Sequence, residues 1–339
     1  MKKKNFKGNL LEFDFARIRT FSVQDRKNLV TRKNILIPKK YRTPVENSLV
    51  LSQNPEFEEL AERIRQAKRK HRPIIWSLGG HVIKAGLSRY LIELMKSGFV
   101  QHLAGNGAVS IHDFELAYLG GTSEDVTSAL EDGTFGMWEE TGRWMNQAIR
   151  DGWLKRSQRR SQRLGYGESL AVYIDKHPKR FPYRDISVLY QGYQCGIPVT
   201  FHIALGTDII HQHPNIDFSA LGGTAGIDFK KYCESVTQLE GGVFLNFGSA
   251  VIGPEVFLKA LSIARSLGFK VKKFTTANFD LLDLGNYRTI NGHNIYHYYY
   301  RPWKNIVSRP VSLGGKGFHF SIDHKVSIPL LYQKLITPT

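Results

Sequence analysis

The stretch that decides the fold reads GIPVTFHIALGTDIIHQHP over residues 196–214. Its apolar run ends abruptly in Gly206-Thr207-Asp208, and two histidines, His211 and His213, follow with one residue between them. A continuous apolar run of this kind is typical of a parallel strand that is buried on both faces of a sheet. Open α/β sheets bind their ligands just beyond the carboxyl ends of such strands. The stretch therefore predicts a buried strand whose polar end belongs to a ligand site.

The same alternation of helix, glycine and buried strand recurs along the chain. Strands are predicted over 74–78, 99–104, 242–247 and 271–275, and helices over 57–70, 87–96, 188–194, 232–239 and 254–267, with a further helix starting at Asp113. Gly98 and Gly268 stand where helices are expected to end, as is common for glycine. Residues 284–320 are aromatic and glycine-rich and show no clear regular element. The pattern predicts an α/β fold, with a Rossmann-like parallel sheet and helices on both faces.

The positive charge of the chain is concentrated in two segments. The net charge is +17 over 339 residues; residues 1–72 carry 19 Lys and Arg against 8 Asp and Glu, and residues 151–180 carry 8 against 3. We predict a basic N-terminal arm over residues 1–55 and a single domain over 56–335, with a surface insertion around 151–187. Such basic segments are either solvated surface or a docking arm for an anionic partner, so a weak RNA contact through the arm stays open. Few aromatic residues are interleaved with the charges, which argues against a base-stacking platform.

Cysteine content and hydropathy indicate the compartment. The two cysteines, Cys195 and Cys233, form no metal-type CxxC pair and fit a reduced intracellular protein. No stretch approaches the ~20 uninterrupted apolar residues that span a bilayer. The first residues, Met1 to Lys4, are not followed by the apolar segment of a signal peptide. We therefore expect a cytoplasmic protein with no membrane span.

Several predicted strands end in small or polar residues. These ends are Gly79-Gly80-His81, Asn106-Gly107-Ala108, Gly206-Thr207-Asp208, Gly248-Ser249-Ala250 and Thr275-Thr276-Ala277. Small residues let the backbone approach a ligand closely, and the N-termini of the following helices favour phosphate. Because the carboxyl ends of parallel strands share one edge, the five ends together predict a dinucleotide crevice. The strict GxGxxG fingerprint is absent, and tight turns of an ordinary α/β fold are the alternative reading.

The order of these segments resembles deoxyhypusine synthase over residues 70–335. The family's PVxxPALTD strand is similar to residues 198–208, its TAGG stretch to residues 106–108 with Asp113 beyond, its NTA and FDxxD to residues 275–277 and 279–283, and its VSIPLL segment to residues 326–331. The motifs Ile111-His112-Asp113-Phe114-Glu115 and Gly248-Ser249-Ala250-Val251 are similar to those of the bacterial deoxyhypusine-synthase-like branch.

The resemblance implies an NAD-dependent transferase. In that family NAD takes a hydride from a polyamine such as spermidine, and an aminobutyl or similar group passes through an enzyme lysine imine to an acceptor amine or protein lysine. A homotetramer with sites near subunit interfaces is also implied. Carried onto this sequence, the resemblance assigns cofactor binding to Gly79, Gly80, His81, Asn106, Gly107, Asp113, Thr207, Asp208, Thr276, Ala277 and Asp280, substrate binding to Asp283, His211 and Trp303, and catalysis to Lys304, Glu255 and His213.

The chain departs from the family at three of these positions. The glycine that separates Trp303 from Lys304 in the family is missing, Glu255 stands where the family has its active-site histidine, and His213 falls near a family carboxylate. These exchanges favour an amine other than spermidine, or loss of the lysine route.

Two other functions stay open. The pair His211-x-His213 places both rings on one side of an extended segment, so that Asp208 or His202 could complete the site of a metal-dependent hydrolase. The basic arm and the missing family histidine instead favour a non-catalytic NAD- or RNA-binding module.

Overall fold

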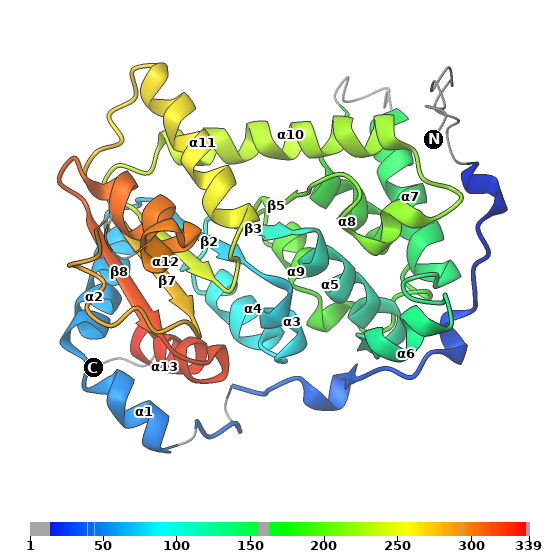
Figure 1. The fold of residues 1–339 in the computed structure, drawn as a ribbon, viewed down its shortest axis with the longest axis horizontal. Coiled ribbons are helices and arrows are strands. Elements are labelled where there is room, and N and C mark those ends of the chain that lie inside the picture. Colours follow the sequence, from blue (N-terminus) through cyan, green and yellow to red (C-terminus); the bar gives the residue numbers. More distant parts are fainter. Residues whose placement is uncertain are drawn as a thin grey trace, which may run out of the picture.

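A six-stranded parallel sheet forms the centre of the computed structural model, which describes residues 14–336 except 39, 44, 155–162, 292 and 294 (Figure 1). The strands are β2 (Ile74–Leu78), β3 (His102–Asn106), β5 (Val199–His202), β6 (Val243–Phe247), β7 (Thr275–Asp280) and β8 (Lys316–Ser321). They lie in the order β5-β3-β2-β6-β7-β8, and every neighbouring pair is parallel. Counted along the chain this is the order 3-2-1-4-5-6 of the Rossmann fold. The predicted α/β fold is confirmed.

Helices cover both faces of the sheet. They are α1 (Val45–Ser52), α2 (Pro55–Arg69), α3 (Gly80–Lys84), α4 (Ser88–Lys96), α5 (Gly107–Leu119), α6 (Val126–Glu131), α7 (Glu139–Leu154), α8 (Tyr166–Lys176), α9 (Val188–Gln194), α10 (Phe218–Thr237), α11 (Ile252–Ser266), α12 (Ile295–Tyr299) and α13 (His324–Ile336). Helices α10 and α11 pack on one face, along the top of Figure 1, while α2, α4 and α13 belong to the core on the other. None of these helices is long and apolar enough to cross a membrane.

Aromatic side chains join the central strands on the face covered by α2 and α13. Trp76 of β2 stacks on Phe247 of β6 with ring centroids 4.9 Å apart, and Phe247 stacks on Phe279 of β7 at 4.3 Å. Phe279 in turn stacks on Phe320 of β8 at 5.0 Å. All four rings are buried, so this face of the sheet belongs to the core.

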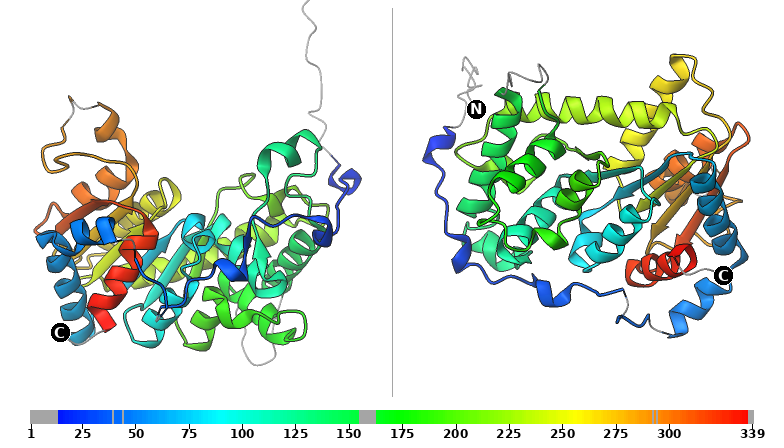
Figure 2. Two further views of the ribbon diagram at one scale, coloured as in Figure 1. Left: turned by 90° about the horizontal axis from the view of Figure 1, so that it is seen from below. Right: turned by 180° about the vertical axis from the view of Figure 1, so that it is seen from behind.

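The predicted arm is docked along the body, as the dark blue segment of Figure 2 shows. We name residues 14–38 the strap. Its β1 (Val30–Thr31) pairs antiparallel with β4 (Gly121–Thr122), the Leu36 amide donates to the Gly86 carbonyl oxygen at 2.8 Å, and Val23 is buried. Residues 1–13 of the predicted arm lie outside the described residues.

Two predicted strand ends are placed elsewhere by the structure. The strand expected over 271–275 is wrong: β7 begins at Thr275, where it pairs with Val243 at the start of β6. Residues 271–274 therefore precede the strand, although Val271 and Phe274 are buried. Strand β5 ends at His202, so Thr207 and Asp208 lie beyond it in a turn that leads to a 3-10 helix over Ile209–Gln212.

Regular structure also occurs where the sequence pattern was weakest. Residues 284–320 contain α12, a π-helical turn over Trp303–Ser308 and the edge strand β8. Within the expected surface insertion, α8 buries Tyr166, Leu170 and Ile174, so this part belongs to the core. Residues 155–162 of that expected insertion lie outside the described residues.

Candidate functional site

The reversal of strand order places two glycine loops in contact at the carboxyl edge of the sheet. The chain runs outward from β2 to β3 and β5, then returns to β6 on the other side of β2. Ligands of open α/β sheets bind at this switch point. A Cβ on Gly79, after β2, would lie 2.2 Å from the carbonyl oxygen of Gly248, after β6. Gly248 itself has a φ of +68°, so both loops depend on glycine for their close approach.

Two buried polar groups at this point have unpaired atoms. His324, the first residue of α13, is 5% exposed, and its Nδ1 makes no hydrogen bond within the described residues. Burial lowers its pKa to about 4, so the ring is neutral at neutral pH. Its Nε2 approaches Gly248, since a Cβ there would lie 2.6 Å from that nitrogen. An unpaired buried polar atom costs about 1–3 kcal/mol, and a bound ligand would remove this cost.

The second unpaired atom is Asn246 Oδ1, at the end of a chain of hydrogen bonds that links side chains of β8, β7 and β6. His319 Nε2 donates to the carbonyl oxygen of Leu282 at 3.0 Å, so His319 Nδ1 accepts from the Asn278 amide at 3.0 Å. Asn278 Oδ1 then accepts from Asn246 Nδ2 at 2.7 Å. The direction of these hydrogen bonds leaves Asn246 Oδ1, in β6, as a buried acceptor without a partner among the described residues.

A cavity of about 220 Å³ opens beside the switch point, beyond β3. We name it the carboxyl-edge cavity. Residues of the strap, α3, α5, the 123–126 segment and the loop after β5 line it, among them Arg26, Lys84, His112, Glu115, Glu124 and Asp208. Both signs of charge occur in this lining, so the cavity suits a small polar ligand.

Asp208, a predicted site residue, lies in the lining of the carboxyl-edge cavity. Its carboxylate lies against the backbone of Gly107, where a Cβ would come within 1.9 Å of Oδ2. That oxygen is buried without a hydrogen bond in the described part of the chain, and burial raises the pKa of Asp208 to about 6. His211 Nδ1 accepts from the Gly206 amide at 3.1 Å and the Asp208 amide at 3.2 Å. The neutral ring therefore carries its proton on Nε2, 3.8 Å from Asp208 Oδ2.

The structure brings most of the predicted cofactor residues to the carboxyl edge. Gly79, Gly80 and His81 follow β2, Asn106 caps α5 by accepting from the Val109 amide at 3.2 Å, and Asp280 ends β7. Gly107, Thr207 and Asp208 belong to the same edge. Their roles in binding stay predictions.

Three of the predicted cofactor residues lie elsewhere. Thr276 and Ala277 are fully buried in the first half of β7, so the expectation that they end a strand is wrong. Asp113 is buried beneath the start of α9, where it accepts from Ser187 Oγ at 2.5 Å and from the Val188 and Leu189 amides at 2.7 and 3.1 Å. Asp113 thus caps a helix. Burial raises its pKa to about 6, against these hydrogen bonds.

The histidine pair does not converge on one site. His213 is buried against α7, where a Cβ on Gly142 would lie 2.1 Å from its Nδ1, and its Nε2 donates to the Gly136 carbonyl oxygen at 2.8 Å. Within the described residues, no group of three His, Cys, Asp or Glu side chains could hold a metal ion. The metal-hydrolase alternative for Asp208, His211 and His213 is therefore wrong.

The predicted catalytic and substrate residues of the C-terminal part lie around the segment between β7 and β8. Lys304 Nζ lies 5.4 Å from the ring centroid of Tyr299, and buried Trp303 donates to the Tyr287 carbonyl oxygen at 2.9 Å. The Asp280 carboxylate accepts from the Tyr300 hydroxyl, which holds this segment beside the end of β7. Asp283 is exposed and accepts from the Gly285 amide at 2.8 Å.

Glu255 joins α11 to the same segment. Its carboxylate is paired with Lys259 and, at 3.2 Å, with Arg301, and it accepts from Asn305 at 3.1 Å. Lys259 chiefly, with Arg301, lowers the pKa of Glu255. A carboxylate held by two cations is a poor replacement for a proton-transferring histidine.

Sequence reasoning missed the charged lining of the carboxyl-edge cavity. His112 and Glu115 stand three residues apart on α5 and hence on one face of it, a signal that was present in the sequence. Arg26, Lys84 and Glu124 come from other segments, and only the fold brings them to α5.

Comparison with known proteins gives one family match. A family model described as the C-terminal Rossmann-fold domain of ArgZ-like arginine dihydrolases matches residues 58–153, well under half of the chain. No curated protein matches the sequence.

Solved structures match at low identity. Apo ArgZ, an arginine dihydrolase from the ornithine-ammonia cycle in cyanobacteria, is 17% identical with a TM-score of 0.48, over 83% of this chain and 32% of ArgZ. AgrE in its ternary complex with ornithine and NAD+ is 16% identical with a TM-score of 0.47, over 87% of this chain and 34% of AgrE. A candidate deoxyhypusine synthase from Entamoeba histolytica is 9% identical with a TM-score of 0.44, over 88% of this chain and 95% of that protein. The chain spans about a third of the length of ArgZ and AgrE.

Proposed function

We propose that this chain is an NAD-dependent enzyme that acts on a small amine at the carboxyl edge of the sheet. The observation that carries the proposal is the switch point between β2 and β6, where glycine loops touch and two buried polar atoms have no hydrogen-bond partner in the described part of the chain. The strand order is that of dinucleotide-binding folds, whose crevice lies at this point.

The residues present at the switch point fit a dinucleotide. The backbones of Gly79-Gly80 and Gly248-Ser249 would hold the pyrophosphate, because loops without side chains allow close approach. Asn246 Oδ1 and His324 Nδ1 would supply hydrogen bonds to the cofactor that the protein alone leaves unmade. When bound, NAD would accept a hydride from the carbon that carries the substrate amine.

The carboxyl-edge cavity would hold the amine. Above its raised pKa of about 6, Asp208 is an anion, and its Oδ2 makes no hydrogen bond among the described residues, which suits an ammonium group. Glu124, also in the lining, adds a second carboxylate. The resemblance to deoxyhypusine synthase extends the proposal to aminoalkyl transfer from a polyamine such as spermidine to an acceptor amine, with Lys304 as the carrier. Lys84 gives the cavity a cation as well, so diamino acids are the second substrate class to be tested.

The test is to mix the protein with NAD and follow absorbance at 340 nm on adding spermidine, putrescine, ornithine or lysine. We expect NADH from at least one amine, and a lowered rate in Asp208→Asn, which keeps the shape of the side chain but removes its charge. NAD binding without NADH from any amine would instead favour the non-catalytic NAD-binding module. Failure to bind NAD would overturn the proposal.

The lysine route has a separate test. After incubation with NAD, spermidine and borohydride, mass spectrometry of the digested protein should find the aminoalkyl adduct on Lys304. Lys304→Ala should lose the adduct and the transfer but keep NAD binding, whereas the exposed control Lys325→Ala should keep all three. An adduct on another lysine, or full transfer by Lys304→Ala, would exclude Lys304 as the carrier.

A further inference from the structure

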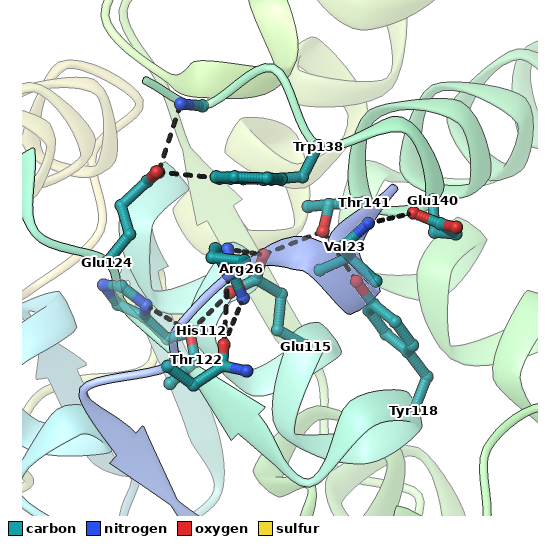
Figure 3. A network of polar contacts seen from close by, with 12 residues as sticks. Val23, Arg26, His112, Glu115, Tyr118, Thr122, Glu124, Trp138, Glu140 and Thr141 are labelled. Atoms are coloured by element: carbon teal, nitrogen blue, oxygen red, sulfur yellow. Dashed lines mark hydrogen bonds and ion pairs between the residues drawn. The ribbon is translucent and has the colours of Figure 1, made fainter. Parts of the chain in front are cut away.

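A buried ion pair joins the strap to α5 next to the carboxyl-edge cavity. Arg26 Nη1 lies 2.8 Å from Glu115 Oε1, with the two side chains 2% and 1% exposed (Figure 3). Glu115 also accepts from Thr122 Oγ1 at 2.5 Å and from Thr141 Oγ1 at 2.8 Å. Burial alone would raise the pKa of Glu115, but the charge and hydrogen bond of Arg26 overcome it and hold that pKa below its ordinary value. Glu115 is therefore a carboxylate, which only accepts.

The Glu115 carboxylate determines which atom donates in each hydrogen bond between Glu115, Thr122 and His112. Because Glu115 accepts, the Thr122 hydroxyl donates to it, and the Thr122 oxygen is left to accept from His112 Nδ1 at 2.8 Å. His112 therefore carries its proton on Nδ1. Its Nε2 keeps a lone pair that makes no hydrogen bond within the described residues, and His112 lines the same cavity as Asp208.

Position and charge state both suit this ring to be an acceptor. The strap places Thr122 by strand pairing, since Val30 of β1 stands opposite Thr122 of β4. Burial lowers the pKa of His112 to about 4; Glu115 raises it, and Lys84 and Arg26 lower it further. The imidazole is hence neutral at neutral pH, with its lone pair available.

We infer that His112 is a specificity-determining acceptor for a substrate N–H group, and that Thr122, Glu115 and Arg26 are positioning residues that hold its tautomer. This inference rests on the proposed function, because it names the group that selects the amine in the same cavity. Asp208 would take the charge of an ammonium, while His112 Nε2 would take one of its N–H hydrogens. A ligand that offers only acceptors, such as a carboxylate or phosphate, would find no donor on His112 and is selected against.

The tautomer can be tested without any activity. In protein labelled with ¹⁵N at histidine, long-range ¹H–¹⁵N spectra should show His112 with a protonated Nδ1 and an unprotonated Nε2. Thr122→Val, which keeps the shape but removes the hydroxyl, should release the ring to the other tautomer, and Thr122→Ser should keep the wild-type pattern. A protonated Nε2 in the wild type would overturn the inference.

The role in selection is tested with the amine that produces NADH. His112→Phe should raise KM for the amine about tenfold or more, as expected for loss of one charge-assisted hydrogen bond, and leave the Kd of NAD unchanged. Thr122→Val should raise KM severalfold, with rescue by Thr122→Ser. NADH formation that is unaffected in His112→Phe would overturn the inference while the proposed function stands. If no amine yields NADH in the wild type, the proposed function fails and the role in selection falls with it, while the spectra still decide the tautomer.

Discussion

The carboxylate of Asp208 is pressed against Gly107, and within the described residues its Oδ2 makes no hydrogen bond; the Nε2–H of the neutral His211 ring lies 3.8 Å from that oxygen. In the protein without ligand this arrangement is unfavourable for an anion, and burial therefore raises its pKa. Carboxylates with strongly shifted pKa values are enriched at functional sites, although Asp113, with a pKa raised to a similar value, caps a helix. Because Asp208 also lines the carboxyl-edge cavity, it supports the proposed site at the scale of single residues.

The raised pKa of Asp208 predicts how stability depends on pH. The folded-state pKa of about 6 lies above the ordinary value of 3.8, so the folded state binds this proton more tightly than the unfolded state. The contribution of Asp208 is therefore most favourable below about pH 4 and is lost as the pH rises through 6, by on the order of 3 kcal/mol.

Urea denaturation between pH 4 and 8 measures this effect. Asn does not ionise, so Asp208→Asn should lack this loss of stability. The free energy of unfolding of the variant should therefore fall less with rising pH than that of the wild type. The exposed control Asp132→Asn should follow the wild type. Parallel curves for Asp208→Asn and the wild type would contradict the prediction.

The strap is the element that completes the site. It supplies Arg26 to the buried ion pair, aligns β4 through β1, and passes close to Gly86, whose φ is +79°. A Cβ on Gly86 would lie 2.1 Å from the carbonyl oxygen of Asn34 in the strap. The strap can therefore lie flat on the body only because residue 86 is glycine.

Substitution of Gly86 separates strap docking from backbone strain. Gly86→Ala and Gly268→Ala both place a side chain at positive φ, and this backbone strain should lower the free energy of unfolding by roughly 1–2 kcal/mol in each. The two differ in space, because a Cβ on Gly268 meets nothing within 4 Å. We expect Gly86→Ala to lose about 1 kcal/mol more in urea denaturation and to expose residues 30–36 to limited proteolysis. Equal losses and equal proteolysis for the two variants would show that the strap does not depend on Gly86.

At the scale of the whole molecule, apolar side chains are exposed beside the carboxyl edge. Tyr296 is 90% exposed, Leu281 68%, Tyr299 62% and Ile295 60%. Clusters of exposed large apolar residues commonly mark protein–protein contacts. The homotetramer implied by the resemblance to deoxyhypusine synthase would cover this cluster with a second copy of the chain.

Light scattering coupled to gel filtration tests this assembly. The wild type should elute as a homotetramer, and Tyr296→Glu should give a smaller species, because a buried unpaired carboxylate opposes association. Leu154→Glu is the matched control, because Leu154 is also apolar and exposed but lies at the end of α7, outside the cluster. It should leave the assembly unchanged. A monomeric wild type would exclude the homotetramer.

The sequence alone determined the strands and helix ends that depend only on neighbouring residues. Strands β2 and β6 are continuous apolar runs, and Gly98 and Gly268 end their helices at positive φ as predicted. The same signals misplaced β7, because Val271 is apolar and buried without being in a strand. The polar end of its apolar run predicted a site role for Asp208, and that role stays a prediction.

Only the tertiary structure decided which side chains meet. Arg26 and Glu115 are 89 residues apart, and no periodicity relates them. His211 and His213, adjacent in pattern, separate because one faces Asp208 and the other packs under α7. A strand is specified by the burial of its own residues, whereas a site at a sheet edge depends on strand order, and strand order is set by the packing of the whole chain.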